Sequence, residues 1–114
     1  MTSVVIKSVD ETAVRRATDA WAVRLFAQHP EIEEIVVFGS FAEGRWAPGS
    51  DLDVFVRIAR SDVPIRERIG LLMPGTFPVG VDLFPFTDEE IAERRGSPLL
   101  EAVARSRWRY LRGA

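Results

Sequence analysis

The sequence predicts an α/β (α+β) domain, in which a small mixed β-sheet is flanked by helices. Three observations support this fold class. Short apolar runs rich in β-branched and aromatic residues alternate with amphipathic segments. Proline and glycine signals separate these segments. A chain of 114 residues can form one hydrophobic core but not two. We therefore treat residues 1–114 as a single domain and expect the helices to cover one side of the sheet.

The first helix is predicted to begin near Asp10 or Thr12, because residues 8–11 have the spacing of a capping box. Apolar side chains then recur at helical spacing. The helix should end at His29, because Pro30 disfavours helical geometry in the residue before it. His29 is therefore expected to cap this helix or to lie on the surface.

Three strands are expected in the middle of the chain. Residues 32–38 are rich in β-branched side chains and are terminated by Gly39. A Pro-Gly-Ser turn at residues 48–50 precedes a second strand over residues 52–58. Residues 79–84 form a third apolar strand. A further helix could follow the second residue of the Gly-Ser pair directly.

The remaining elements are mostly helical. Residues 64–73 suit a helix with proline in its first turn. Thr87 is expected to cap a short helix that runs through Arg94. Residues 98–105 form a last helix, and residues 108–111 form either a final short strand or a tail.

Composition narrows the classes of protein. The chain is 46% hydrophobic and 28% charged, with a formal net charge of −2 and no cysteine, which excludes disulfides and thiolate metal sites. No apolar run approaches the roughly 18 residues of a membrane span, and the N-terminus lacks the build of a signal peptide. We expect a cytoplasmic protein without membrane association.

The C-terminal segment differs from the rest in charge. Residues 94–114 carry six arginines and one acid, whereas residues 1–93 carry nine basic and sixteen acidic groups. Arginines that alternate with Trp108 and Tyr110 could engage RNA or a partner protein. They are equally typical of an edge strand whose outward arginines discourage edge pairing. We favour the edge strand and do not expect direct nucleic-acid binding.

The most informative feature is a Gly39-Ser40 pair followed, ten residues later, by Asp51 and Asp53. Residues two apart in a strand share a face, so these two carboxylates would lie roughly 6–7 Å apart. Their repulsion is relieved by Mg²⁺, which prefers oxygen ligands. Asp82 in the third strand adds oxygens enough for two ions. A glycine-serine turn allows backbone groups to approach a phosphate closely.

Simpler interpretations exist for each part alone. An Asp-x-Asp at a strand start is most often solvated or caps a turn. Asp82, flanked by apolar residues, could be a structural acid bonded to an arginine. Trp46, between the motif halves, could stack on a base, but we favour a hydrophobic plug under the loop. The joint pattern, in this order and spacing, favours a site for metal and nucleoside triphosphate.

Residues 36–56 closely, and 79–84 more loosely, resemble the DNA polymerase β-like nucleotidyltransferase superfamily. The string from Gly39 to Gly44 and the Gly-Ser-Asp-Leu-Asp-Val-Phe-Val string beginning at Gly49 are similar to those of minimal nucleotidyltransferases (MNT proteins). The resemblance implies the nucleotidyltransferase fold. It also implies an enzyme that moves a nucleoside monophosphate, usually AMP from ATP, to an acceptor hydroxyl with release of pyrophosphate.

The resemblance also implies roles for individual residues. Asp51 and Asp53 would ligate Mg²⁺, and Asp82 would complete this catalytic and metal site and help to activate the acceptor. Gly39 and Ser40 would bind the triphosphate. One departure concerns Glu43, which stands where MNT proteins often have a basic residue. Arg45 could take over its phosphate contact.

The acceptor is expected to come from outside the domain. MNT proteins resemble the antitoxin half of a toxin–antitoxin pair whose partner is a helical HEPN ribonuclease, so a tyrosine on such a partner is the first candidate. A non-catalytic module that neutralises its partner by occlusion is the second. The third is an adenylyltransferase for a small molecule such as an aminoglycoside, completed by a homodimer.

Overall fold

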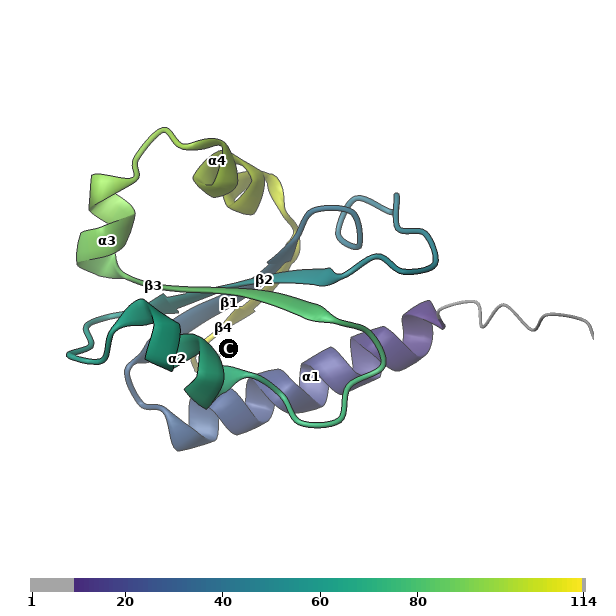
Figure 1. Ribbon diagram of the computed structural model, residues 1–114, viewed down its shortest axis with the longest axis horizontal. Helices are drawn as coiled ribbons and strands as arrows, with labels where there is room; N and C mark the ends of the chain where they lie inside the picture. Colours follow the sequence, from purple (N-terminus) through teal and green to yellow (C-terminus); the bar gives the residue numbers. More distant parts are fainter. Residues whose placement is uncertain (1–9, 114) are drawn as a thin grey trace, which may run out of the picture.

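A computed structural model describes residues 10–113 as a four-stranded sheet with helices on both faces. In chain order the elements are α1 (Glu11–Gln28), β1 (Ile32–Phe38), β2 (Leu52–Ile58), α2 (Ile65–Leu72), β3 (Val81–Thr87), α3 (Asp88–Glu93), α4 (Pro98–Arg105) and β4 (Trp108–Leu111). Figure 1 shows α1 and α2 below the sheet and α3 and α4 above it. This is the mixed α+β architecture that the sequence predicts.

The sheet has the strand order β3-β2-β1-β4 and mixes two pairing directions. Strand β1 is antiparallel to both β2 and β4, whereas β2 and β3 are parallel. Consequently the end of β1 and the beginnings of β2 and β3 meet at one edge of the molecule. Pro85 lies inside β3, and an edge strand tolerates proline because its outer side makes no ladder hydrogen bonds.

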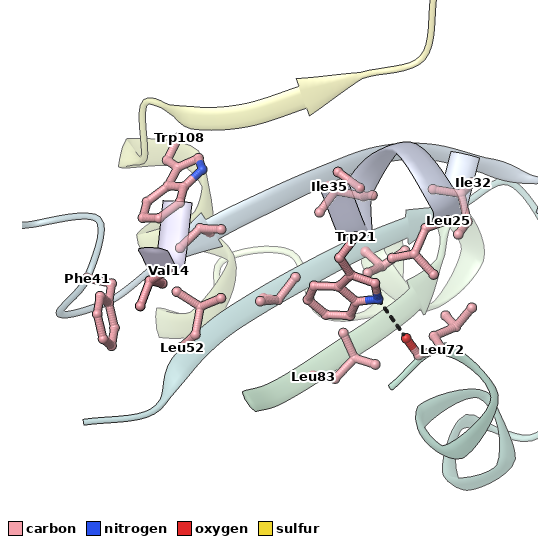
Figure 2. Close-up of a cluster of buried hydrophobic side chains, with 14 of the residues drawn as sticks. Val14, Trp21, Leu25, Ile32, Ile35, Phe41, Leu52, Leu72, Leu83 and Trp108 are labelled. Carbon is pink, nitrogen blue, oxygen red and sulfur yellow. Dashed lines mark hydrogen bonds between the residues drawn. The ribbon is translucent and has the colours of Figure 1, made fainter. Parts of the chain in front are cut away.

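Alternate residues of the strands face two separate cores. The larger core is formed with α1 and α2, and Figure 2 shows Trp21 at its centre, its indole Nε1 donating to the carbonyl oxygen of Leu72 at 3.1 Å. The smaller core lies on the opposite face, where Val36 and Phe55 pack against Val103 of α4. The expectations of a single hydrophobic core and of helices on only one side of the sheet are therefore wrong. Two apolar faces are present, and each is covered.

The helix ends follow the capping signals. Asp10 caps α1 by accepting from the Thr12 N–H at 3.0 Å, and His29 caps its C-terminus through a bond from its N–H to the Leu25 carbonyl. The capping-box residue Ser8 lies outside the described residues. Thr87 caps α3 in a complete capping box with Glu90.

The C-terminal residues form the edge strand that we favoured. Strand β4 pairs only with β1, and Arg109 on it is exposed, with its Nε 3.1 Å from Glu34 Oε2. Strand β3 begins at Val81 rather than at residue 79 and continues to Thr87. Among residues 10–113, no helix is long and apolar enough to cross a membrane.

Candidate active site

The predicted carboxylates gather where β1 ends and β2 and β3 begin. Asp53 of β2 pairs with Phe38, the last residue of β1, on one side and with Asp82 of β3 on the other. Neighbouring strands are about 4.8 Å apart, and register partners point to the same face. Asp53 and Asp82 thus stand side by side on the face covered by α3 and α4, beyond the aromatic side chain of Phe55.

Gly39 places the backbone directly against Asp53. Its φ is +75°, a conformation that favours glycine. A Cβ atom at this position would lie only 2.2 Å from Asp53 Oδ2. The glycine of the Gly-Ser pair is therefore required both by its backbone angle and by the carboxylate that occupies the space beside it.

Asp51 lies just before β2 and leans towards the neighbouring strand. A Cβ added to Gly80 would lie 2.4 Å from Asp51 Oδ1, and the Gly80 carbonyl accepts from the Leu52 N–H at 2.8 Å. Our sequence analysis assigned no role to Gly80. A glycine beside an apolar strand often marks a close approach, and this signal could have identified it.

The carboxylates repel one another. Burial raises the pKa of Asp53, and the charges of Asp82 and Asp51 raise it further. Within residues 10–113, no arginine or histidine nitrogen comes within 4.0 Å of any of the three carboxylates. Asp82 is exposed, so it is not the buried structural acid that we considered as an alternative. A bound cation would relieve this repulsion.

The donor set fits Mg²⁺, but the three carboxylates do not form a ready-made cage. Among the described residues, no three His, Cys, Asp or Glu side chains converge closely enough to hold a metal ion. The reason is that Asp51 leans towards Gly80 whereas Asp53 leans towards Gly39. Mg²⁺ commonly takes only one or two carboxylates, and water and substrate phosphates complete its shell. Asp53 and Asp82, adjacent in register, suit that mode.

The Gly-Ser pair is held by an apolar anchor in the turn that follows it. Phe41 is buried in the larger core and stacks on Trp46, with ring centroids 5.6 Å apart and planes inclined by 8°. Trp46 thus packs under the loop as we favoured. The Arg45 N–H closes the turn by donating to the Ser40 carbonyl at 2.8 Å. No helix begins at Phe41, so the expected helix N-terminus beside the phosphates is absent from this segment.

Glu43 and Arg45 neutralise each other. Arg45 Nη2 lies 3.2 Å from Glu43 Oε1, and both side chains are exposed. The acid at residue 43 therefore does not present an uncompensated charge to a phosphate. Arg45, which we predicted to bind the nucleotide, is engaged in this pair.

A cleft of about 300 Å³ adjoins the carboxylates. Its lining comes from the turn after β1 and from the end of α4: Gly39, Ala42, Glu43, Ala102, Arg105, Ser106 and Arg107. Gly39 belongs to this cleft and also touches Asp53, so the cleft and the carboxylates are contiguous. A larger hollow of about 380 Å³ between α3 and α4 contains none of the predicted site residues. Sequence analysis did not place Arg105 and Arg107 beside the predicted site, although the basic C-terminal segment was a signal.

Comparisons with known proteins agree with this geometry. The family model described as "Nucleotidyltransferase domain" matches residues 22–99. A crystal structure of a candidate nucleotidyltransferase from Sulfolobus solfataricus is similar in fold, with a TM-score of 0.59 over 89% of this chain and 80% of that chain, at 16% sequence identity. No curated protein sequence matches the chain. The matched family segment contains the Gly-Ser pair and all three aspartates.

Proposed function

Because the chain belongs to the nucleotidyltransferase domain family, we propose that it catalyses Mg²⁺-dependent transfer of AMP from ATP to an acceptor hydroxyl. The observation that carries this proposal is the position of Asp53. It is partly buried between Asp82 and the end of β1, its pKa is raised by burial and by its acidic neighbours, and the backbone of Gly39 closes on it. Such an arrangement costs folding free energy, and a divalent cation would offset that cost.

The chain's own residues would share the work as follows. Asp53 and Asp82, with Asp51 beside them, would hold the metal, which when bound supplies charge neutralisation at the transferring phosphate. Asp82 is exposed, so it can also accept the proton of an approaching hydroxyl. The acceptor oxygen would form its bond to the α-phosphorus as the bond to pyrophosphate breaks. Gly39 and Ser40 would hold the triphosphate through backbone groups and a hydroxyl.

The acceptor that we propose is a hydroxyl on a partner protein, a tyrosine of a helical HEPN-type ribonuclease. The protein would then act as the antitoxin of a toxin–antitoxin pair. This part of the proposal is supported by the likeness of residues 36–56 to MNT proteins, in which the same Gly-Ser and Asp-x-Asp strings occur.

A labelling experiment tests the reaction. The purified protein is incubated with ATP labelled at the α-phosphate, Mg²⁺ and a host lysate, in parallel with the Asp53→Asn variant. A labelled protein band that requires Asp53 is the expected result. If the label appeared only in small molecules, the acceptor would be a small molecule of the aminoglycoside type and not a protein. Equal labelling by folded Asp53→Asn would overturn the proposed role of the carboxylates.

A second candidate is a non-catalytic module that blocks its partner by binding. The observation in its favour is that no three potential ligands converge within residues 10–113. It predicts no Mg²⁺-dependent ATP binding in calorimetry. Micromolar binding of ATP that disappears in the Asp53→Asn and Asp82→Asn variants would exclude it.

A further inference from the structure

We propose that Arg105 and Arg107 form the binding site for the β- and γ-phosphates of the nucleotide. Both side chains are exposed and line the cleft that Gly39 shares with the carboxylates. Neither makes a hydrogen bond or an ion pair within residues 10–113. The inference rests on the proposed function, because it says which residues bind the β- and γ-phosphates of the ATP substrate.

The backbone that carries the two arginines is fixed by the residue between them. The Ser106 hydroxyl donates to the Val37 carbonyl of β1 and accepts from the Trp108 N–H at 3.1 Å. The Ser106 N–H donates to the Val103 carbonyl at 3.2 Å and so closes the end of α4. The chain at residues 105–107 is thus tied to β1, the strand that ends at Phe38, just before Gly39. Positioned cations on a fixed backbone lose less entropy when they bind an anion.

Three other arginines of the basic segment, Arg94, Arg109 and Arg112, make contacts that support the fold. Arg109 pairs with Glu34, and Arg112 donates from Nε to the Ile32 carbonyl at 2.7 Å. Arg94 donates to the Glu90 carbonyl at 3.2 Å. The basic charge of the C-terminal segment therefore divides into arginines that support the fold and arginines that are available to a ligand. Arg105 and Arg107 are of the second kind and face the cleft.

The charge of the cleft suits a polyphosphate. Glu43 is the acid in its lining, and Arg45 already neutralises it at 3.2 Å. Guanidinium groups bind phosphate oxygens in a bidentate, charge-assisted manner. A triphosphate that lies in the cleft with its α-phosphate near Gly39 would place its terminal phosphates towards the arginines and its reacting phosphate beside Asp53. This arrangement supplies positive groups in addition to Arg45 of the turn after Gly39, which is paired with Glu43.

The test separates phosphate binding from metal binding. Calorimetry measures the affinity for inorganic tripolyphosphate and for ATP with Mg²⁺, in the wild type and in the double variant R105Q/R107Q. The matched control is R60Q/R95Q, which removes two equally exposed arginines outside the cleft. Binding of Mn²⁺, followed by electron paramagnetic resonance without nucleotide, reports on the carboxylates independently.

We expect R105Q/R107Q to lose at least tenfold in affinity for both ligands, because each charge-assisted contact contributes roughly a factor of ten. Its Mn²⁺ affinity, and the phosphate affinity of the control, should stay within about twofold of wild type. Equal affinities for R105Q/R107Q and wild type would overturn the inference. The inference would also be overturned if the protein bound no tripolyphosphate but still carried out Asp53-dependent labelling. In that case the proposed function would stand. Arginine-dependent tripolyphosphate binding without any nucleotidyl transfer would instead remove the proposed function.

Discussion

Replacing Gly39 with alanine tests whether the position of the Asp53 carboxylate matters for activity, apart from any effect on the stability of the fold. The added Cβ would lie 2.2 Å from Asp53 Oδ2, whereas ordinary van der Waals contact begins near 3.4 Å. The carboxylate must therefore retreat by about 1 Å. A displacement of about 1 Å in a catalytic group can cost roughly 100-fold in rate. We expect a loss of that size in Asp53-dependent nucleotidyl transfer by Gly39→Ala.

The control for this substitution is Gly96→Ala. Gly96 also has a positive φ, +86°, but a Cβ there would meet no atom within 4 Å. Both variants should lose about 1–2 kcal/mol of unfolding free energy, because alanine is strained in this region. Urea denaturation measures this loss, and α-phosphate labelling measures transfer. If both variants lost transfer activity equally, the contact between Gly39 and Asp53 would not be the cause and the reasoning would be wrong.

Three further predictions concern electrostatics and packing. The pKa of Asp53 is raised in the fold, so its ionised form destabilises the metal-free protein. Asp53→Asn should therefore raise the urea midpoint at pH 7, and this gain should disappear at acid pH. An unchanged midpoint at pH 7 would contradict the prediction. Arg68 lowers the pKa of Glu90 from 4.5 to about 2, so Glu90→Gln should cost about 2 kcal/mol at pH 7. That difference should shrink as the pH falls from 4.5 towards 2, and a pH-independent cost would refute the assignment. Trp21→Phe removes the 3.1 Å hydrogen bond to the Leu72 carbonyl and leaves a small void. Thermal or urea unfolding should therefore show a loss of about 2–3 kcal/mol in the free energy of unfolding. An unchanged midpoint would show that the bond contributes nothing.

Several elements of the fold were predictable from local signals. β1 and β2 occupy the predicted residues 32–38 and 52–58, because their β-branched side chains and flanking turn residues act locally. The capping role of Thr87 was predictable for the same reason, since a capping box spans only four residues. The sequence motif likewise assigned Gly39 and Asp53 to one candidate site, and the structure places the Gly39 backbone beside the Asp53 carboxylate.

Features that depend on distant pairing were not predictable from local patterns. We expected helices on one side of the sheet. Strand β2 carries apolar side chains on both of its faces, however, so each face needs its own covering layer. The approach of Asp51 to Gly80 depends on the parallel register of β2 and β3. The position of Arg105 depends on the pairing of Trp108 with Val37, which brings the end of α4 to the end of β1. No short-range signal encodes these registers.

The topology divides the candidate site into two halves that meet at Gly39. The carboxylates belong to β2 and β3, whereas the arginines of the cleft belong to the connection between α4 and β4. Gly39, directly after β1, touches both halves, because it lies beside Asp53 and also lines the cleft. A ligand that carries both negative phosphates and a divalent cation satisfies both halves at once. A free anion would be attracted by the arginines but repelled by the carboxylates. A free metal ion would be attracted by the carboxylates but repelled by the arginines. Under the proposed function, this charge separation on the two sides of Gly39 would favour a metal–triphosphate complex over either component alone.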